Sequence, residues 1–396
     1  MAWLAIAMAG VFGAFVGSFL NVCVYRLPRN QSVVAPPSRC LSCGTRLRWS
    51  DNLPLIGYAL LRGRCRWCGT RYGSRYVWME LLVATLTALI AWRVLSAPGM
   101  YVAPWLTFVD RGTGIPSWAV AMAVGALAVL VWYLLVSALI DLDHMIIPDE
   151  LTKSFQVAAP FVAVATGIGL QFEWAPDDWL ARRSALGAFV GTPARFLWWF
   201  GGIVAGALAF LALSLPLARR IYSTYCPLPW RWSDDDHRGF RIGVLWFMGA
   251  TVPPAAIALA LVWATPLPTA AGDGASGAVA RLAGAAHLAN AVLGSLAGWL
   301  SLYLVGLIGT VAFRRNAMGF GDVKFLAPVG AFLGPIGVIY AFSLAAVCGA
   351  VIGIPMRLLA RQREIPFGPY LALGALASAL FAPALHRWLL DLPVAP

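Results

Sequence analysis

Charged residues are scarce in this chain. Only 12% of its 396 residues are Asp, Glu, Lys or Arg, whereas a soluble domain carries about 25%. So few charges cannot cover a water-facing surface, which excludes a soluble globular protein. Apolar residues make up 60% of the sequence, in runs long enough to cross a hydrocarbon layer of about 30 Å. We therefore expect an all-α, polytopic membrane protein embedded in a lipid bilayer.

Ten apolar runs are expected to form transmembrane helices. They cover residues 2–22, 77–95, 118–140, 154–170, 197–217, 242–264, 287–313, 324–338, 339–356 and 368–386. The first run has no basic residue before it and no small-residue cleavage site after it, so we interpret it as a retained helix. The expected regions are a first helix (1–22), a zinc-binding loop domain (23–76), helices (77–170), an insertion with two extra helices (171–286) and a C-terminal helical part (287–396).

The formal net charge of +12 is explained by how the basic residues are divided between the two sides of the membrane. When the connections are assigned alternately to two sides, one side receives 22 of the 29 basic residues and the other side seven. The positive-inside rule makes the first side cytoplasmic and predicts that both termini lie outside. Because membrane orientation accounts for the basic excess, we expect no nucleic-acid partner.

Four of the seven cysteines form two C-x-x-C pairs. They are Cys40, Cys43, Cys65 and Cys68. Two such pairs, each followed by a glycine that allows a sharp turn, can wrap four thiolates around one Zn²⁺. With sulfur at all four positions, the predicted zinc is structural and folds a loop too small to have its own core. Free thiols or a redox pair are the alternative, although a reducing cytoplasmic side argues against disulfides.

Acidic residues at the ends of membrane helices are costly and therefore indicate function. Asp141 follows the third run, and Asp322 precedes the eighth within the segment Gly319–Lys324. In the predicted topology both acids lie on the same side at similar depth. Two carboxylates in one site share a proton, so the charged one can accept a proton from attacking water and the other can donate to the oxyanion. Gly319 and Gly321 leave the backbone open to an extended substrate.

Other polar residues near these motifs have simpler explanations. Asp143 is expected to face loop water, and His144 is expected to be solvated. Asp149 follows a proline in a position typical of a helix cap. Lys324 is interpreted as an interfacial lysine whose ammonium reaches toward water. We interpret the run Asp234–His237 as a solvated part of a loop rich in Arg and Trp, not as a metal site.

These motifs resemble those of the type IV prepilin peptidases (prepilin leader peptidase/N-methyltransferases), which are G-x-G-D aspartyl proteases of membranes. The resemblance covers about residues 1–165 and 287–386. Its segments are Gly17–Val22, Tyr25–Pro28, the four cysteines, Trp49–Pro54, Leu61–Cys65, Arg75 and Tyr76, Glu80, Asp141–Asp143, Ile147–Asp149, Gly319–Lys324 and Ile365–Pro369. The family usually has eight helices, so residues 171–286 are a departure from its pattern.

The resemblance implies roles for residues and a substrate. Asp141 and Asp322 would be the catalytic pair, supported by Gly319, Gly321 and Lys324, and the four cysteines would bind zinc. The enzyme would lie in the bacterial inner membrane with its active site facing the cytoplasm. There it would cleave the basic leader of a prepilin or pseudopilin of type IV pili or type II secretion. It would then methylate the new N-terminal residue from S-adenosylmethionine, for which we identify no binding residues.

Three other classes of protein compete with this interpretation. A transporter that uses the two acids as a proton relay would place them near the midplane and leaves the cysteine pairs unexplained. A metal-dependent membrane transferase using Asp141, Asp143 and Asp234–Asp236 predicts sensitivity to chelators and insensitivity to Asp322→Asn. A disulfide-exchange protein is disfavoured because the cysteines fall on the cytoplasmic side.

Overall fold

The computed structural model describes residues 2–96, 117–171, 220, 224, 234–264, 274–314, 318–353, 355 and 366–390. Within these residues the protein is helical, with isolated β-bridges in place of any strand. The helices are α1 (Ala2–Arg26), α2 (Ile56–Leu61), α3 (Arg75–Ser96), α4 (Ser117–His144), α5 (Asp149–Gln171), α8 (Asp234–Ala264), α9 (Gly274–Phe313), α10 (Phe320–Cys348) and α12 (Gly368–Leu390).

Five stretches in the described residues are long and apolar enough to cross a membrane. They are Trp3–Arg29, Arg75–Leu95, Val124–His144, His287–Phe313 and Phe320–Gly353. Two shorter apolar helices cover Phe247–Ala258 and Gly368–Phe381. The predicted class of multi-pass helical membrane protein is thus confirmed, whereas the number of ten spans is not. The predicted run 197–217 lies outside the described residues.

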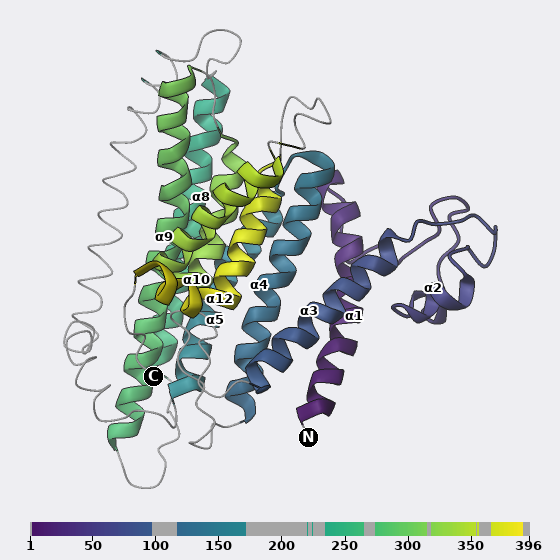
Figure 1. Ribbon diagram of the computed structural model, residues 1–396, viewed down its shortest axis with the longest axis horizontal. Helices are drawn as coiled ribbons and strands as arrows, with labels where there is room; N and C mark the ends of the chain where they lie inside the picture. Colours follow the sequence, from purple (N-terminus) through teal and green to yellow (C-terminus); the bar gives the residue numbers. More distant parts are fainter. Residues whose placement is uncertain are drawn as a thin grey trace.

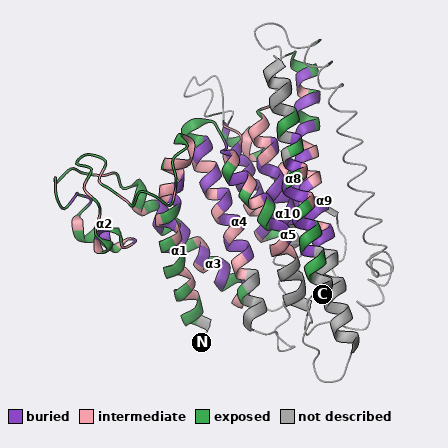
Figure 2. Cartoon of the chain, turned by 180° about the vertical axis from the view of Figure 1, so that it is seen from behind, coloured by how far each residue is buried: buried purple, intermediate pink, exposed green. Residues whose placement is uncertain are grey.

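Helices α1 and α3 pack closely because glycines line their interface. A Cβ atom on Gly17 would lie 2.8 Å from the Cα of Glu80, and one on Gly13 would lie 2.7 Å from the hydroxyl of Thr87. Small residues at such positions let two backbones approach within a membrane. The pair carries residues 27–74, called the cysteine loop here, which projects from the end of α1 opposite the N-terminus (Figure 1). Figure 2 shows that this loop is largely exposed.

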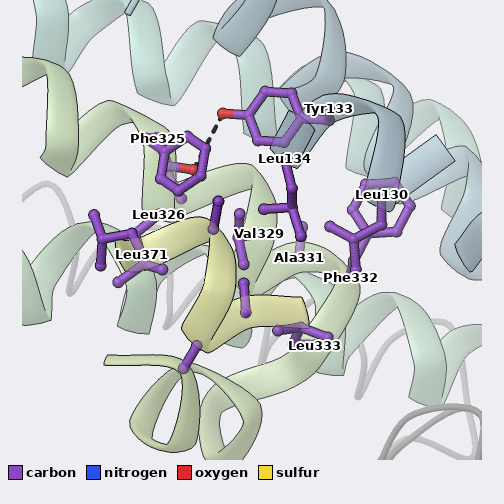
Figure 3. Close-up of a cluster of buried hydrophobic side chains, with 14 of the residues drawn as sticks. Leu130, Tyr133, Leu134, Phe325, Leu326, Val329, Ala331, Phe332, Leu333 and Leu371 are labelled. Carbon is purple, nitrogen blue, oxygen red and sulfur yellow. Dashed lines mark hydrogen bonds between the residues drawn. The ribbon is translucent and has the colours of Figure 1, made fainter. Parts of the chain in front are cut away.

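The core of the bundle forms where α4 and α9 pack against α10. Tyr133 of α4 stacks on Phe325 of α10, with ring centroids 5.4 Å apart, and its hydroxyl donates to the Phe325 carbonyl at 3.2 Å (Figure 3). On the other side, a Cβ atom on Gly298 of α9 would lie 2.2 Å from the Leu326 carbonyl oxygen. Aromatic stacking and close backbone approach therefore hold the first half of α10 in place.

Helix α10 folds back on itself at Gly334. This residue has φ 71° and ψ 174°, a conformation that glycine tolerates best, and Pro335 after it has no N–H to continue the helix. The second arm runs antiparallel to α12, because Ser378 donates to the Gly337 carbonyl while Gly349 lies beside Phe367. The predicted runs 324–338 and 339–356 correspond to the two arms, but the predicted break at residue 338 was wrong by a few residues.

Both ends of the α10 hairpin consequently lie at one end of the bundle. Gly321, near the start of α10, lies beside Ile147 in the turn between α4 and α5. A Cβ atom added to Gly321 would lie 3.8 Å from the Cβ atom of Ile147. The end of the hairpin reaches the beginning of α12 through Phe367. The end of α4 and the beginnings of α5, α10 and α12 therefore converge, and they bring together segments far apart in the sequence.

Candidate active site and metal centre

Asp141 lies in the last turn of α4 and is almost fully buried, with 6% of its surface exposed. Its Oδ2 accepts a hydrogen bond of 2.9 Å from the backbone N–H of Gly368, the first residue of α12. A Cβ atom at residue 368 would lie only 2.6 Å from the same oxygen. Gly368 therefore both contacts and orients the carboxyl group of Asp141.

Asp322 lies in the first turn of α10, three residues after the extended N-cap residue Gly319. An added Cβ atom at Gly319 or Gly321 would meet no atom closer than 3.8 Å. An added methyl group at either glycine would therefore make ordinary van der Waals contact, and the predicted approach of a substrate strand to this backbone stays a prediction.

The fold brings Asp141 and Asp322 into one site. The two residues occupy the converging ends of α4 and α10, and Gly321, next to Asp322, lies beside Ile147 in the turn that follows α4. Two carboxyl groups in such a relationship titrate as a pair and cannot both be charged without a cost. This arrangement meets the requirement for general acid–base chemistry on one substrate.

Lys324 forms an ion pair with Asp149, so its interpretation as a lysine reaching into water was wrong. Its Nζ lies 2.7 Å from Asp149 Oδ1, and Lys153 Nζ lies 3.4 Å from Asp149 Oδ2. Partial burial opposes the charge of Asp149, but the hydrogen bond and charge of Lys324, together with Lys153, outweigh it and lower the pKa of Asp149. The pair connects the beginning of α5 to the beginning of α10, two residues beyond Asp322.

The predicted capping role of Asp149 was also wrong. Asp149 is the first residue of α5, and the N–H of Thr152 donates to the Pro148 carbonyl at 3.3 Å. A carboxylate close to two ammonium groups is drawn to them in preference to the backbone, because hydrogen bonds between charged groups are stronger.

Asp143 is exposed, as predicted, but it also pairs with a residue of another helix. Arg75 Nη2 lies 2.6 Å from its Oδ2 and connects the beginning of α3 to the end of α4. His144 is exposed, as expected.

The loop interpretation of residues 234–237 was wrong, since α8 begins at Asp234. Acids in a first helical turn are favoured by the helix dipole. The side chains of these residues lie outside the described part of the chain.

The four predicted cysteines converge. The Sγ atoms of Cys40, Cys43, Cys65 and Cys68 all lie within 4.8 Å of one another. The Sγ atoms of Cys40 and Cys68 are 3.8 Å apart, and two thiolates bound at about 2.3 Å to a tetrahedral zinc lie about 3.8 Å apart. The donor set and its spacing therefore fit one Zn²⁺.

The two halves of this cluster have the same backbone geometry. In the first half, Gly44 has φ 70° and donates to the Cys40 carbonyl at 2.9 Å. In the second, Gly69 has φ 69° and donates to the Cys65 carbonyl at 3.0 Å. No atom lies within 4 Å of an added Cβ atom at either glycine, so the positive φ explains the residue type.

Two buried acids hold the cysteine loop in place. One joins two parts of the loop, and the other joins the loop to helix α3. Asp51 accepts three hydrogen bonds from Arg66 at 2.6–3.1 Å, and this contact lowers the pKa of Asp51. Glu80 of α3 accepts the N–H of Leu55 at 2.8 Å. These roles were not predicted, although both acids belong to segments of the family resemblance.

Comparisons with known proteins agree with this architecture. Residues 11–94 match the Bacterial Peptidase A24 N-terminal domain, and residues 274–354 match the Type IV leader peptidase family. No solved structure matches the chain.

Several relatives carry the name prepilin leader peptidase/N-methyltransferase. The relative from Aeromonas salmonicida (strain A449) is 23% identical over 417 residues, which cover 98% of this chain and 95% of the relative. The relative from Myxococcus xanthus (strain DK1622) is 38% identical over 181 residues, 46% of this chain and 44% of the relative. The one from Pseudomonas aeruginosa is 23% identical and covers 95% of this chain. Together with the cysteine cluster and the paired acids, these matches identify the chain as a member of the type IV leader peptidase family.

Proposed function

We propose that this protein is a membrane aspartyl endopeptidase that removes the leader of type IV prepilins or pseudopilins, with Asp141 and Asp322 as its catalytic pair. The observation that carries the proposal is the convergence of the two acids at the ends of α4 and α10. The names of the relatives supply the substrate class.

The two acids have different roles in the proposed reaction. The hydrogen bond from Gly368 to Asp141 Oδ2 favours a negative charge on Asp141, so we assign Asp141 as the base and Asp322 as the holder of the shared proton. Asp141 takes a proton from water while the water oxygen bonds to the scissile carbonyl carbon, and Asp322 gives its proton to the carbonyl oxygen. When the tetrahedral intermediate collapses, one of its two hydroxyl groups returns a proton to Asp322 as the C=O bond re-forms. The C–N bond breaks, and the proton on Asp141 passes to the leaving amine.

The metal centre has a structural role in this proposal. Four thiolates would fill every position of a tetrahedral Zn²⁺ and leave none for water or substrate. The metal would hold together the two halves of the cysteine loop, and Asp51 and Glu80 would transmit that order to α3. No step of peptide cleavage needs it.

We further propose that the chain spans the inner membrane ten times, with its termini outside and the catalytic pair at the cytoplasmic face. The 22-to-7 division of basic residues supports this orientation. The ion pair between Arg75 and Asp143 is independent support, because it joins the base of the Arg-rich cysteine loop to the end of α4 that carries Asp141.

The second proposed activity is methylation of the new N-terminus. The relatives' names include N-methyltransferase, and S-adenosylmethionine would supply an activated methyl group.

Co-expression with a type IV prepilin in a host that lacks its own prepilin peptidase tests both activities. The mature pilin should lack its leader and carry one additional methyl group, as measured by mass spectrometry of its N-terminal peptide. A set of prepilins that all keep their leaders in the presence of the inserted protein would contradict the proposal.

A further inference from the structure

A cavity of about 460 Å³ lies between the C-terminal half of α1 and the cysteine loop. Ser18, Phe19 and Arg26 line it from α1, and Trp49 and Asn52 line it from the loop. These residues belong to three segments of the family resemblance that neither the catalytic pair nor the metal centre uses. A cavity of this size lies within the range of small-molecule sites, about 300–1,000 Å³.

The lining combines aromatic faces with one positive charge. Trp49, in the loop, is 81% exposed, so its ring is open to a ligand, and Phe19 contributes a second aromatic ring from α1. Arg26 is held in position because its two terminal nitrogens donate to the Ser32 and Pro36 carbonyls, at 2.9 and 2.7 Å. Each of these nitrogens carries a second hydrogen that can bind an anion. No acidic residue lines the cavity.

The walls of this cavity are held in a defined arrangement. On the α1 side, Gly17 packs directly on the Cα of Glu80, next to Ser18. On the loop side, Asp51 is bound by Arg66, which follows the metal-binding Cys65. A site with fixed walls loses less conformational entropy when it binds a ligand.

The cavity lies at the same end of the bundle as the catalytic pair. Asn21 of α1 donates to the Tyr76 carbonyl of α3 at 3.1 Å, and the adjacent Arg75 pairs with Asp143 of α4. Asp143 is two residues beyond Asp141. A peptide N-terminus released at the catalytic pair therefore emerges on the side of the membrane on which the cavity lies.

We propose that this cavity binds S-adenosylmethionine, an inference that rests on the proposed methyltransferase activity. The adenine ring would stack on Trp49, and the sulfonium cation would contact the aromatic faces of Phe19 and the neighbouring Phe15. Arg26 would bind the carboxylate, while Asn52 would bind polar edges of the ligand.

The methyl transfer balances without any further reactant. The lone pair of the neutral α-amine of the cleaved pilin forms a bond to the methyl carbon. The C–S bond breaks with its electron pair on sulfur, which leaves the thioether S-adenosylhomocysteine. The methylated ammonium then releases one proton to water.

Binding of S-adenosylhomocysteine to the zinc-loaded full chain in lipid nanodiscs, measured by calorimetry, tests the assignment without relying on activity. The wild type should bind at one saturable site, and Trp49→Ala should weaken binding about tenfold. Trp78→Ala is the matched control, because Trp78 is an exposed residue of α3 that does not line the cavity. Leader cleavage should persist in Trp49→Ala.

A second ligand distinguishes contact from loss of folding. Methylthioadenosine keeps the adenine and the sulfur but lacks the carboxylate. Arg26→Gln should therefore weaken S-adenosylhomocysteine about tenfold while it leaves methylthioadenosine unchanged, whereas Trp49→Ala should weaken both ligands.

Unaltered binding in both variants, or equal loss of both ligands in Arg26→Gln, would overturn the assignment. The assignment would also be overturned if a phospholipid occupied the wild-type cavity, was lost in Trp49→Ala and did not compete with S-adenosylhomocysteine. The cavity would then be a lipid site. A wild type that cleaves and methylates prepilin but binds the probe elsewhere refutes only the cavity. A wild type that cleaves but neither methylates nor binds the probe refutes the methyltransferase activity itself.

Discussion

The N–H of Gly368 donates a 2.9 Å hydrogen bond to Oδ2 of Asp141. This contact joins the beginning of α12 to the end of α4, and it leaves no room for a side chain at residue 368. The carboxyl group of Asp141 is thus oriented by a residue 227 positions later in the chain. The geometry of the proposed base depends on the docking of α12.

Gly368→Ala should reduce the rate of leader cleavage by at least about tenfold, because a methyl group 2.6 Å from Oδ2 must displace the carboxyl group or the helix. The initial cleavage rate in proteoliposomes measures the effect. Gly125→Ala in α4 is the control, since an added Cβ atom there meets no atom within 4 Å. Equal rates in the two variants would show that the contact does not orient Asp141.

Asp141→Asn and Asp322→Asn should each abolish cleavage while the protein remains inserted and zinc-loaded. The amide keeps the size and hydrogen bonding of the carboxyl group but cannot exchange the proton. Because the two residues act as a unit, the double variant should be scarcely worse than either single one. Asp143→Asn, at an exposed residue two positions away, should retain substantial cleavage. Near-normal cleavage by Asp322→Asn would instead favour the metal-dependent transferase.

Lys324→Met should lower kcat several-fold, because its ion pair with Asp149 connects α5 to the turn of α10 that carries Asp322. Both side chains are partly exposed, at 26% and 39%, so the pair should contribute only about 0.2–1 kcal/mol to stability. A double-mutant cycle with Asp149→Asn, measured as kcat, should reveal coupling. Lys153→Met, which removes the longer contact of 3.4 Å, should have a smaller effect on kcat. If the effects of Lys324→Met and Asp149→Asn on kcat are additive, the positioning role is contradicted.

The purified protein should contain about one Zn²⁺ per chain, since four thiolates fill one tetrahedral site. Cys43→Ser should lower the metal content, measured by elemental mass spectrometry, and increase proteolysis of the cysteine loop. Cys348→Ser, remote from the cluster in the sequence, should keep both properties of the wild type. A Cys40/Cys43 double serine variant that retains full zinc occupancy would refute the site.

Reporter fusions test the proposed orientation. A reporter inserted after Gly73, in the Arg-rich cysteine loop, should be cytoplasmic, whereas one near Asp273 should be external. An external Gly73 fusion would reverse the side assigned to the catalytic pair, because Arg75 and Asp143 bring the loop and the end of α4 to the same side.

Several features of the fold and site could be predicted because they depend on composition or on short spacings. The scarcity of charge identified a membrane protein, and each C-x-x-C pair places two sulfurs together through its own turn. The turn of α10 was misplaced, although Gly334 and Pro335 both disfavour a continuous helix. Composition locates apolar runs, but it does not locate a bend within a run that remains apolar throughout.

The sequence by itself determined that this is a helical membrane protein with a four-cysteine cluster, and it selected Asp141 and Asp322 as the acids to consider. Only the tertiary structure decided that Gly368 holds Asp141, that Lys324 binds Asp149, and that Arg26 and Trp49 line one cavity. The reason is physical: burial preference and turn chemistry act over a few residues, whereas these contacts depend on how helices from distant parts of the chain pack together.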